Sequence, residues 1–182
     1  MDEGLISQRY AKAMFRYARD LGVEGLVYEK MNMFLENYLA HPDLQKALLN
    51  PVLSPQDKEM LLSTAIGIEP GEAYLRGIRL LIRNHREMYM RTIALMYQKM
   101  YRKANNIIQV NVVTATELAS SVMEKIQGVV KSHTDSRVEF LHSTDPSIIG
   151  GFILKVGSEQ LDASVRRELK LVRLNLLNKR VL

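Results

Sequence analysis

Apolar residues recur at intervals of three and four along the first part of the chain, up to about residue 105. This spacing places them on one face of a helix, and glycine, proline or a capping residue separates the runs. The expected helices are residues 5–21, 23–40, 43–49, 55–65, 73–84 and 88–102. Gly22 is expected to end the first helix, and Ser54 to cap the fourth. About six helices joined by short loops are typical of a compact bundle.

Beyond this point the pattern becomes mixed. Residues 107–113 are rich in β-branched side chains with a period of two, and residues 137–141 and 152–156 are further expected strands. A helix capped by Thr116 and a final helix over residues 165–178 complete the order β-α-β-β-α. The first of these helices is expected to present one apolar face, formed by Leu118, Val122, Ile126 and Val129. The sequence therefore predicts an all-α N-terminal six-helix bundle, residues 1–105, and a small α+β domain, residues 106–182, with two helices on a short sheet.

The segment before the final helix carries strong turn signals. An Asp145-Pro146 turn leads to Gly150-Gly151 and the strand, and Ser164 is a good N-cap for the helix. The paired glycines precede a strand, whereas glycines that cradle phosphate follow one, so we expect them to be structural. Four apolar residues of the final helix are expected to face the sheet: Val165, Leu169, Val172 and Leu176.

Composition restricts the possible chemistry. The chain of 182 residues is 47% hydrophobic, which is enough for a core, and its net charge of +5 is a mild excess. Because Cys is absent, a disulfide framework, a thiolate zinc site and a cysteine nucleophile are excluded. The four His residues are scattered, and the sequence holds no nucleotide-binding or hydrolase motif. We therefore expect no catalytic residue, no metal site and no cofactor. The acidic N-terminus and the lack of a long apolar run predict neither a signal peptide nor a membrane span.

Some helices carry more apolar surface than one core requires. In helix 5–21, Tyr10, Ala13 and Tyr17 lie on a different flank from the four residues Ala11, Met14, Phe15 and Ala18. In helix 73–84, Leu80 points away from the apolar stripe, beside Ala73, Arg76 and Gly77. Burial within the bundle would explain the surface on the first helix, and Leu80 could be an isolated exposed leucine. A groove for a partner helix explains both surfaces equally well.

Two further surfaces leave alternatives open. Arginines at positions 76, 79, 83 and 86 share one flank of their helix. This pattern favours a face in contact with solvent. The alternative is a basic rim that selects an acidic or amphipathic partner. On the final helix, Leu171, Leu174 and Leu177 lie off the sheet-facing stripe. They suit a helical partner, or they pack against the N-terminal helices or a terminal tail.

At several places the sequence resembles the delta subunit family of F-type ATP synthases, which includes the mitochondrial oligomycin-sensitivity-conferring protein. The motifs are spread over nearly the whole chain and are similar to the family's in order and spacing. They are Arg9-Tyr10-Ala11-Lys12-Ala13-Met14-Phe15, Leu49-Asn50-Pro51-Val52-Leu53-Ser54, Leu81-Ile82-Arg83-Asn84-His85-Arg86, and the Asp145, Gly150-Gly151 and Asp162-Ala163-Ser164-Val165 segment. One departure is that Ala163 and Arg167 stand where many members have glycine.

The resemblance implies a non-catalytic stator subunit. It implies that residues 1–105 bind N-terminal helices of the alpha subunits of the catalytic head, and that residues 106–182 hold the b subunit of the peripheral stalk. In the family the alpha helix lies against the first and fifth helices, where Tyr10, Ala13, Arg76 and Leu80 fall by position, with Tyr17 on the same flank. The protein would then be peripheral, on the cytoplasmic face of the bacterial inner membrane through its complex, without a nucleic-acid partner.

Another class of function remains as the alternative to this interpretation. A basic RNA-binding protein would use the Arg76 to Arg86 flank together with Lys99, Arg102 and Lys103. Its affinity would fall steeply with salt. An enzyme comes third, because the sequence brings no catalytic constellation together.

Overall fold

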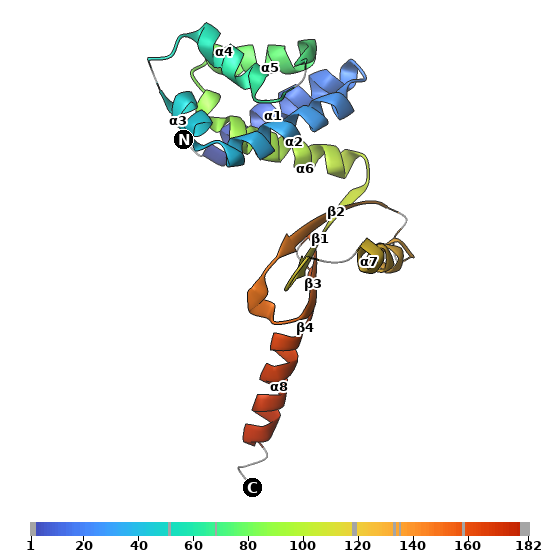
Figure 1. The fold of residues 1–182 in the computed structure, drawn as a ribbon. Coiled ribbons are helices and arrows are strands. Elements are labelled where there is room, and N and C mark those ends of the chain that lie inside the picture. The colour runs from blue at the N-terminus through green and yellow to red at the C-terminus, as the bar shows by residue number, and fades with distance from the viewer. Residues whose placement is uncertain are drawn as a thin grey trace. The chain divides into compact units, whose positions relative to one another are not determined.

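The computed structural model describes residues 3–50, 52–67, 69–117, 120–132, 134, 136–157 and 159–178. The chain divides into two compact units, Met1–Asn105 and Asn106–Leu182. Among the described residues, the first unit is helical and contains no strand (Figure 1). Its elements are α1 (Glu3–Asp20), α2 (Glu24–Ala40), α3 (Pro42–Leu49), α4 (Pro55–Thr64), α5 (Gly71–Arg83), the 3₁₀ turn η1 (Glu87–Tyr89) and α6 (Met90–Ala104).

One core holds the helices of the first unit together. Helix α1 packs against α5 and α6, α2 packs against α6, and α4 packs against α5. Large side chains from four helices are fully buried in this core, including Met31, Phe34, Tyr74 and Tyr97. Burial of the Tyr74 ring raises the pKa of its hydroxyl, which donates a hydrogen bond to the Leu62 carbonyl at 3.3 Å.

The helix-boundary signals of the first unit are confirmed. Gly22 has φ +68° directly after α1, and its N–H donates to the Arg19 carbonyl while the Val23 N–H donates to the Ala18 carbonyl. These bonds satisfy carbonyls that the helix end leaves free. At α4, the Ser54 hydroxyl oxygen accepts a hydrogen bond from the Asp57 N–H at 3.1 Å. Both positions follow from local chemistry, which is why the sequence predicts them.

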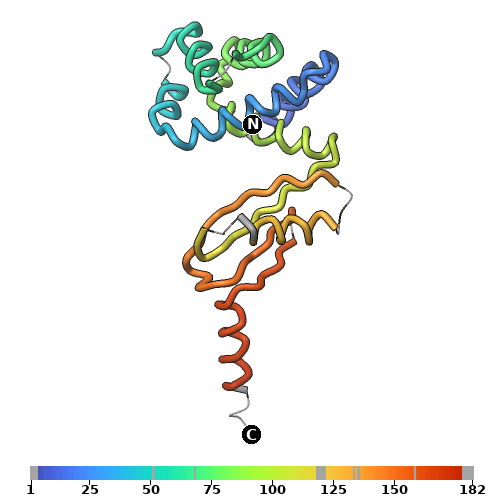
Figure 2. The backbone as a smooth tube through the Cα atoms, turned by 45° about the vertical axis from the view of Figure 1, so that its right-hand side comes forward, coloured from blue at the N-terminus to red at the C-terminus, as the bar shows by residue number. Residues whose placement is uncertain are grey.

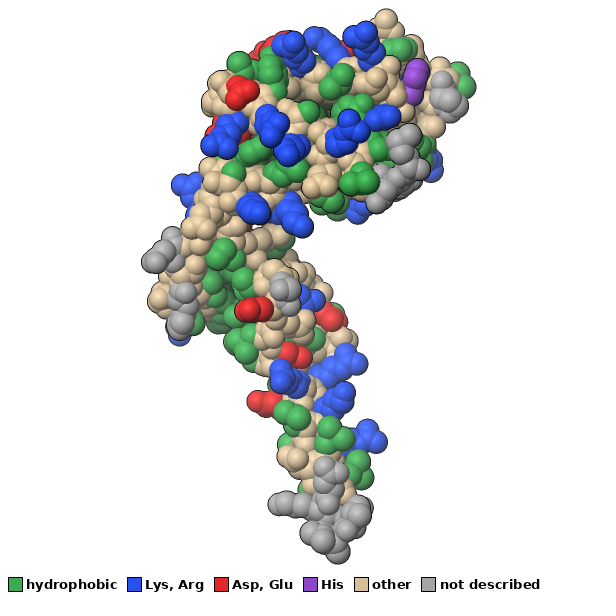
Figure 3. Space-filling model, turned by 180° about the vertical axis from the view of Figure 1, so that it is seen from behind, with side chains coloured by type: hydrophobic (Ala, Val, Ile, Leu, Met, Phe, Trp, Pro, Cys, Tyr) green, Lys and Arg blue, Asp and Glu red, His purple; other side chains and the backbone are tan. Residues whose placement is uncertain are grey.

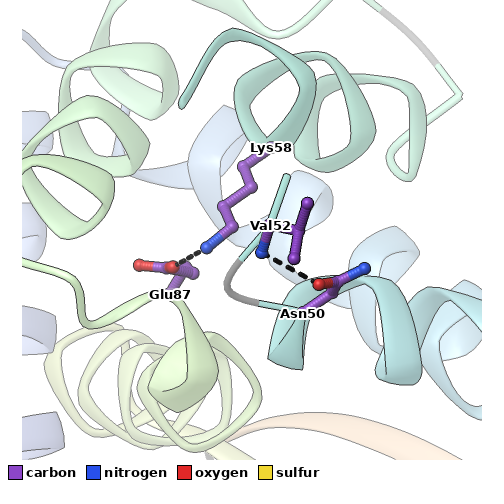
Figure 4. A network of polar contacts seen from close by, with 4 residues as sticks. All are labelled: Asn50, Val52, Lys58 and Glu87. Atoms are coloured by element: carbon purple, nitrogen blue, oxygen red, sulfur yellow. Dashed lines mark hydrogen bonds and ion pairs between the residues drawn. The ribbon is translucent and has the colours of Figure 1, made fainter. Parts of the chain in front are cut away.

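A buried ion pair joins α4 to η1. The Lys58 ammonium contacts the Glu87 carboxylate, and both side chains are nearly inaccessible to solvent (Figure 4). The second carboxylate oxygen of Glu87 has no hydrogen-bond partner among the described residues. The charge of Glu87 is therefore balanced mainly by one lysine.

The second unit is built on a four-stranded sheet with the order β2-β1-β3-β4. Its strands are β1 (Ile107–Thr114), β2 (Arg137–Thr144), β3 (Gly151–Val156) and β4 (Glu159–Ser164). Strands β1 and β2 are parallel, whereas β3 pairs antiparallel with β1 and β4. The remaining elements are α7 (Ser120–Ser132), which lies beside one face of the sheet, the turn η2 (Pro146–Ile148) and α8 (Val165–Asn178) (Figures 1 and 2).

Two details of the predicted second unit are wrong. Strand β4 was not expected, because its one large apolar residue, Leu161, gives no alternating pattern, and its pairing with β3 is a tertiary interaction. Thr116 does not cap a helix: it lies in a bend, and α7 begins at Ser120 within the described part of the chain. The Thr116 carbonyl instead accepts a hydrogen bond from the Thr114 hydroxyl at 2.6 Å. Leu118, which was expected on that helix, lies outside the described residues.

The expected structural role of the glycine pair is confirmed at Gly151. This residue has φ +75°, and a Cβ atom there would lie 2.2 Å from the Ala163 carbonyl oxygen of β4. Gly150 accepts a hydrogen bond at its carbonyl from the Val165 N–H at 3.0 Å. The pair therefore fixes the entry to β3 and the start of α8.

The expected packing of α8 on the sheet is wrong. Val165, Leu169, Val172 and Leu176 are between 37% and 62% exposed. Helix α8 contacts β4 and η2, close to its own first turns, and extends away from the sheet (Figure 2). The helical spacing of these residues identified an apolar stripe correctly, but spacing does not say what covers a stripe.

Candidate functional site: a groove between two helices

The candidate site lies in the first unit, between α1 and α5. An open groove of about 350 Å³ is lined by Ile6, Arg9, Tyr10, Ala13, Leu80 and Arg86. The Leu80 side chain is 42% exposed at this position, so an apolar surface remains available to solvent. The groove therefore combines an exposed leucine, a tyrosine and two arginines.

Close packing of the two helices forms the base of this region. Gly77 of α5 is buried, and a Cβ atom there would lie 2.2 Å from Cε of Met14 on α1. Only glycine allows this approach without displacing the methionine. The sequence placed Gly77 beside Leu80 and left burial and a partner groove open for this surface; in the structure Gly77 itself is used in the contact with α1.

Two arginines hold the tyrosine rings at the edges of the site. The Arg86 guanidinium lies over the Tyr10 ring, 5.5 Å from its centroid, and donates to the Tyr10 hydroxyl at 3.4 Å. The Arg76 guanidinium lies 4.9 Å from the Tyr17 centroid and donates to the Tyr17 hydroxyl at 2.9 Å. Such cation–π pairs restrict the rotation of both partners, which preorganises the rim for binding.

The structure brings together three of the residues expected here, Tyr10, Ala13 and Leu80. The Arg76–Tyr17 pair lies one helical turn further along both helices and continues the same surface. Sequence reasoning missed Ile6 and Arg9 as lining residues, and it considered Arg86 only as part of a basic rim. Ile6 and Arg9 fall on the flank of Tyr10 and Ala13 by helical spacing, so that flank alone could have identified them.

Three of the four arginines expected on one flank contact two neighbouring helices. Arg76 and Arg86 turn to tyrosines of α1, whereas Arg79 pairs with Glu59 of α4, with Nη2 and Oε1 2.8 Å apart. The hydrogen bond and the charge of Glu59 raise the pKa of Arg79. Arg76, Arg79 and Arg83 are exposed, as expected of a solvated face, but three of the four arginines also contact neighbouring helices of the unit.

The second candidate surface is α8. Leu171, Leu174 and Leu177 are 50%, 45% and 52% exposed, and hydrophobic side chains are visible along this helix in Figure 3. The start of the helix is held firmly, because the Ser164 hydroxyl oxygen accepts a hydrogen bond from the Arg167 N–H at 3.2 Å. The Asp162 carboxylate in turn accepts one from the Ser164 N–H at 3.0 Å, and hydrogen bonding by the side chain and backbone of Ser164 lowers the pKa of Asp162. Ser164 therefore caps α8 as the sequence predicted.

Two other kinds of site, a metal centre and a membrane span, lack support in the described residues. They contain no group of three His, Asp or Glu side chains placed to hold a metal ion. None of the described helices combines the length and the apolar character required to cross a membrane. Exposed apolar surface between and along helices is typical of sites that bind another helix.

Comparison with known proteins points to one defined family. Residues 6–176 match the model of the ATP synthase delta (OSCP) subunit family. Among curated relatives, ATP synthase subunit delta of Parabacteroides distasonis is 38% identical over 180 residues, covering 99% of this chain and 100% of the relative. The counterpart from Bacteroides thetaiotaomicron is 35% identical, covering 98% and 97%. The chain belongs to the ATP synthase delta (OSCP) subunit family.

The fold has a counterpart among solved structures. A chain of the cryo-EM structure of the Toxoplasma gondii mitochondrial ATP synthase hexamer superposes with a TM-score of 0.72. The match covers 94% of this chain and 97% of that chain, at 22% sequence identity. This similarity extends over both units and shows that the fold persists at low identity.

Proposed function

We propose that the chain is a non-catalytic stator subunit of an F-type ATP synthase. It links the alpha/beta catalytic head to the b-subunit peripheral stalk and resists the torque of the rotor, so that proton flow stays coupled to ATP synthesis. Membership of the delta family supports this role, and relatives named ATP synthase subunit delta cover nearly the whole chain. No cofactor and no nucleic acid take part.

The first unit binds the head. Helices α1–α6 form the six-helix bundle of the family, and an N-terminal helix of the alpha subunit occupies the groove between α1 and α5. Its contacts are Tyr10, Ala13, Tyr17, Arg76 and Leu80. The observation that carries this proposal is the groove itself, with an exposed leucine between two arginine–tyrosine pairs. Aromatic and arginine side chains are the common anchors of tight interfaces.

The second unit holds the b subunit through Leu171, Leu174 and Leu177. These leucines are exposed on a capped helix, which supports this assignment. If a partner buries about 50 Å² of one leucine side chain, that burial contributes roughly 1 kcal/mol to binding. The subunit is held on the cytoplasmic face of the bacterial inner membrane through these partners. The bacterial origin of the relatives is in keeping with that location.

The groove assignment is tested by Leu80→Asp in the full chain. A charge in the groove is expected to weaken binding of an alpha N-terminal peptide at least about tenfold by calorimetry, with far-UV circular dichroism unchanged. Leu95→Asp is the matched control, because Leu95 is 41% exposed on α6 and does not line the groove. Equal affinity of Leu80→Asp and the control would refute the assignment.

The division of labour is tested by removing residues 171–182. This truncation is expected to abolish binding of the b subunit and to leave binding of the alpha peptide unchanged. Both interactions can be followed in the same preparation by pull-down and calorimetry. Loss of both together would contradict separate roles for the two units.

A further inference from the structure

A second groove, larger than the candidate site, lies between α1 and α6. It encloses about 630 Å³. Its floor is apolar: Phe15 packs edge-on against the buried Tyr97 ring, with centroids 5.5 Å apart, and Met96 and Met100 are half-buried beside it. Methionine side chains adapt to the shape of an incoming apolar group. Such a floor suits the apolar stripe of a partner.

Both rims of this groove are basic. Lys12, Arg16 and Arg19 line it from α1, and Lys99 and Lys103 line it from α6. No Asp or Glu is among the residues that line it. Within the described part of the chain, none of these five side chains makes an ion pair or a hydrogen bond. Arg76, Arg79 and Arg86 of the same unit all have such partners.

This clustering is more than the overall charge requires. The chain carries a net charge of only +5, yet this one groove is surrounded by five cationic groups that have no ion-pair or hydrogen-bond partner among the described residues. Like charges held close together repel one another, and an anionic partner relieves this repulsion. In Figure 3 lysine and arginine side chains likewise surround exposed hydrophobic ones over the helical unit. The groove is therefore complementary to a partner that is apolar in its middle and acidic at its edges.

The shape of the groove favours a helix over a membrane surface. Residues 8, 12, 16 and 19 follow one side of α1 over about 16 Å, roughly three helical turns. A long concave surface with an apolar floor accepts a rod, whereas a flat bilayer contacts convex or flat basic faces. At about 100° per residue, this side of α1 is about 130° from the side that lines the α1/α5 groove. Helix α1 can thus serve both grooves at once.

We propose that the α1/α6 groove binds an acidic amphipathic helix of a partner protein. Leucine-type side chains of that helix contact Phe15, Met96 and Met100, and its carboxylates pair with the two basic rims. The site is separate from the α1/α5 groove, and the proposal does not depend on what occupies that groove.

The test uses the full chain and two synthetic helical peptides of about 14 residues, long enough to span the groove. Both have the same leucine stripe, flanked by Glu in one peptide and by Lys in the other. Calorimetry is expected to detect the Glu peptide only, with an affinity that falls as salt is raised from about 50 mM to 0.5 M. Lys12→Glu/Lys99→Glu is expected to weaken it at least about tenfold.

Matched controls separate this groove from general charge effects. Arg91→Glu/Lys125→Glu makes the same change in net charge at exposed residues outside the groove and is expected to bind the Glu peptide normally. The Leu80→Asp variant is also expected to bind the Glu peptide normally. A failure of the α1/α5 groove assignment can therefore be told apart from a failure of the α1/α6 proposal. If the charge-reversed variant does not fold, Lys12→Gln/Lys99→Gln replaces it.

Three results would overturn the proposal. The first is equal affinity of the chain for the Glu and Lys peptides. The second is that the groove variant and its charge-matched control weaken binding of the Glu peptide equally. The third is that the wild-type chain binds phosphatidylglycerol vesicles but not the Glu peptide. The last result would assign the basic rims to a lipid surface.

Discussion

The buried Lys58–Glu87 pair is a residue contact that a single substitution disrupts. Lys58→Met leaves the Glu87 carboxylate buried without its cation (Figure 4). Because an uncompensated buried charge is costly, the free energy of unfolding is expected to fall by about 3–5 kcal/mol. Urea unfolding followed by tyrosine fluorescence measures this loss.

The double variant Lys58→Met/Glu87→Leu is the control for this change. It removes both charges, and replacement of a buried pair by apolar residues is often neutral or stabilising. The double variant is therefore expected to recover most of the lost stability. A loss below about 1 kcal/mol for Lys58→Met alone would mean that water reaches Glu87.

Gly151 and Gly157 provide a second test at residue scale. Both have positive φ, +75° and +59°, but a Cβ atom at Gly151 meets the Ala163 carbonyl at 2.2 Å, whereas one at Gly157 meets nothing within 4 Å. Gly157→Ala is expected to cost about 1–2 kcal/mol from backbone strain alone. Gly151→Ala is expected to cost more, because the backbone of β4 must also move. Urea unfolding by far-UV circular dichroism compares them, and equal losses would contradict the contact with β4.

At the scale of elements, two aspartates hold the turns around β3, β4 and α8. The Asp145 carboxylate accepts a hydrogen bond from the Ser147 N–H at 2.9 Å, and Asp162 accepts one from the Ser164 N–H at 3.0 Å. Hydrogen bonds from Ser147 and Ser164 favour the charged carboxylates and lower the pKa of both. Each group therefore binds its proton more weakly in the folded chain than in the unfolded one.

The sign of the pH dependence follows from this difference. The stability that these carboxylates contribute is present above the unfolded pKa of about 4 and is lost as pH falls through the folded pKa. We expect the urea concentration at the unfolding midpoint of the second unit to decrease as the pH is lowered through this acid range. The Asp162→Asn variant is expected to lose part of this pH dependence. Carboxyl-carbon NMR titration checks the cause directly. An Asp162 pKa at or above the unfolded value would contradict it.

Elements with local signals could be predicted from the sequence, and those that depend on tertiary pairing could not. Gly22, Ser54 and Ser164 act on backbone groups within a few residues, so their roles were readable. Strand β4 is held by pairing with β3 and lacks apolar alternation, so its sequence resembled a loop. Helix α8 showed its apolar residues, but their spacing could not say that the sheet leaves them exposed.

The candidate groove shows the same limit. Surplus apolar surface on two helices indicated Tyr10, Ala13 and Leu80, and the structure brings these three together. The Arg86–Tyr10 contact joins residues 76 positions apart, and the Gly77–Met14 approach likewise joins α5 to α1. Neither has a local signal, because both arise only when α1 and α5 pack.

At the scale of the whole molecule, the buried residues fall into two sets. The large hydrophobic core cluster contains only residues of the first unit. In the second unit the buried apolar residues are fewer: Ile107, Val110, Val112, Val113 and Ile148. The chain has no tryptophan, and all eight of its tyrosines lie before residue 105. Tyrosine fluorescence therefore reports on the first unit alone.

This distribution predicts two separable unfolding transitions in the full chain. Val112 is fully buried in the sheet, and Val112→Ala is expected to destabilise the second unit by about 2 kcal/mol. In a urea titration, part of the far-UV circular dichroism signal should then be lost at a lower concentration, while the tyrosine transition stays in place. Ile78→Val, in the core of the first unit, should instead move the tyrosine transition. If Val112→Ala shifts both signals together, the two cores unfold as one cooperative structure, and changes in one unit will reach the binding surfaces of the other.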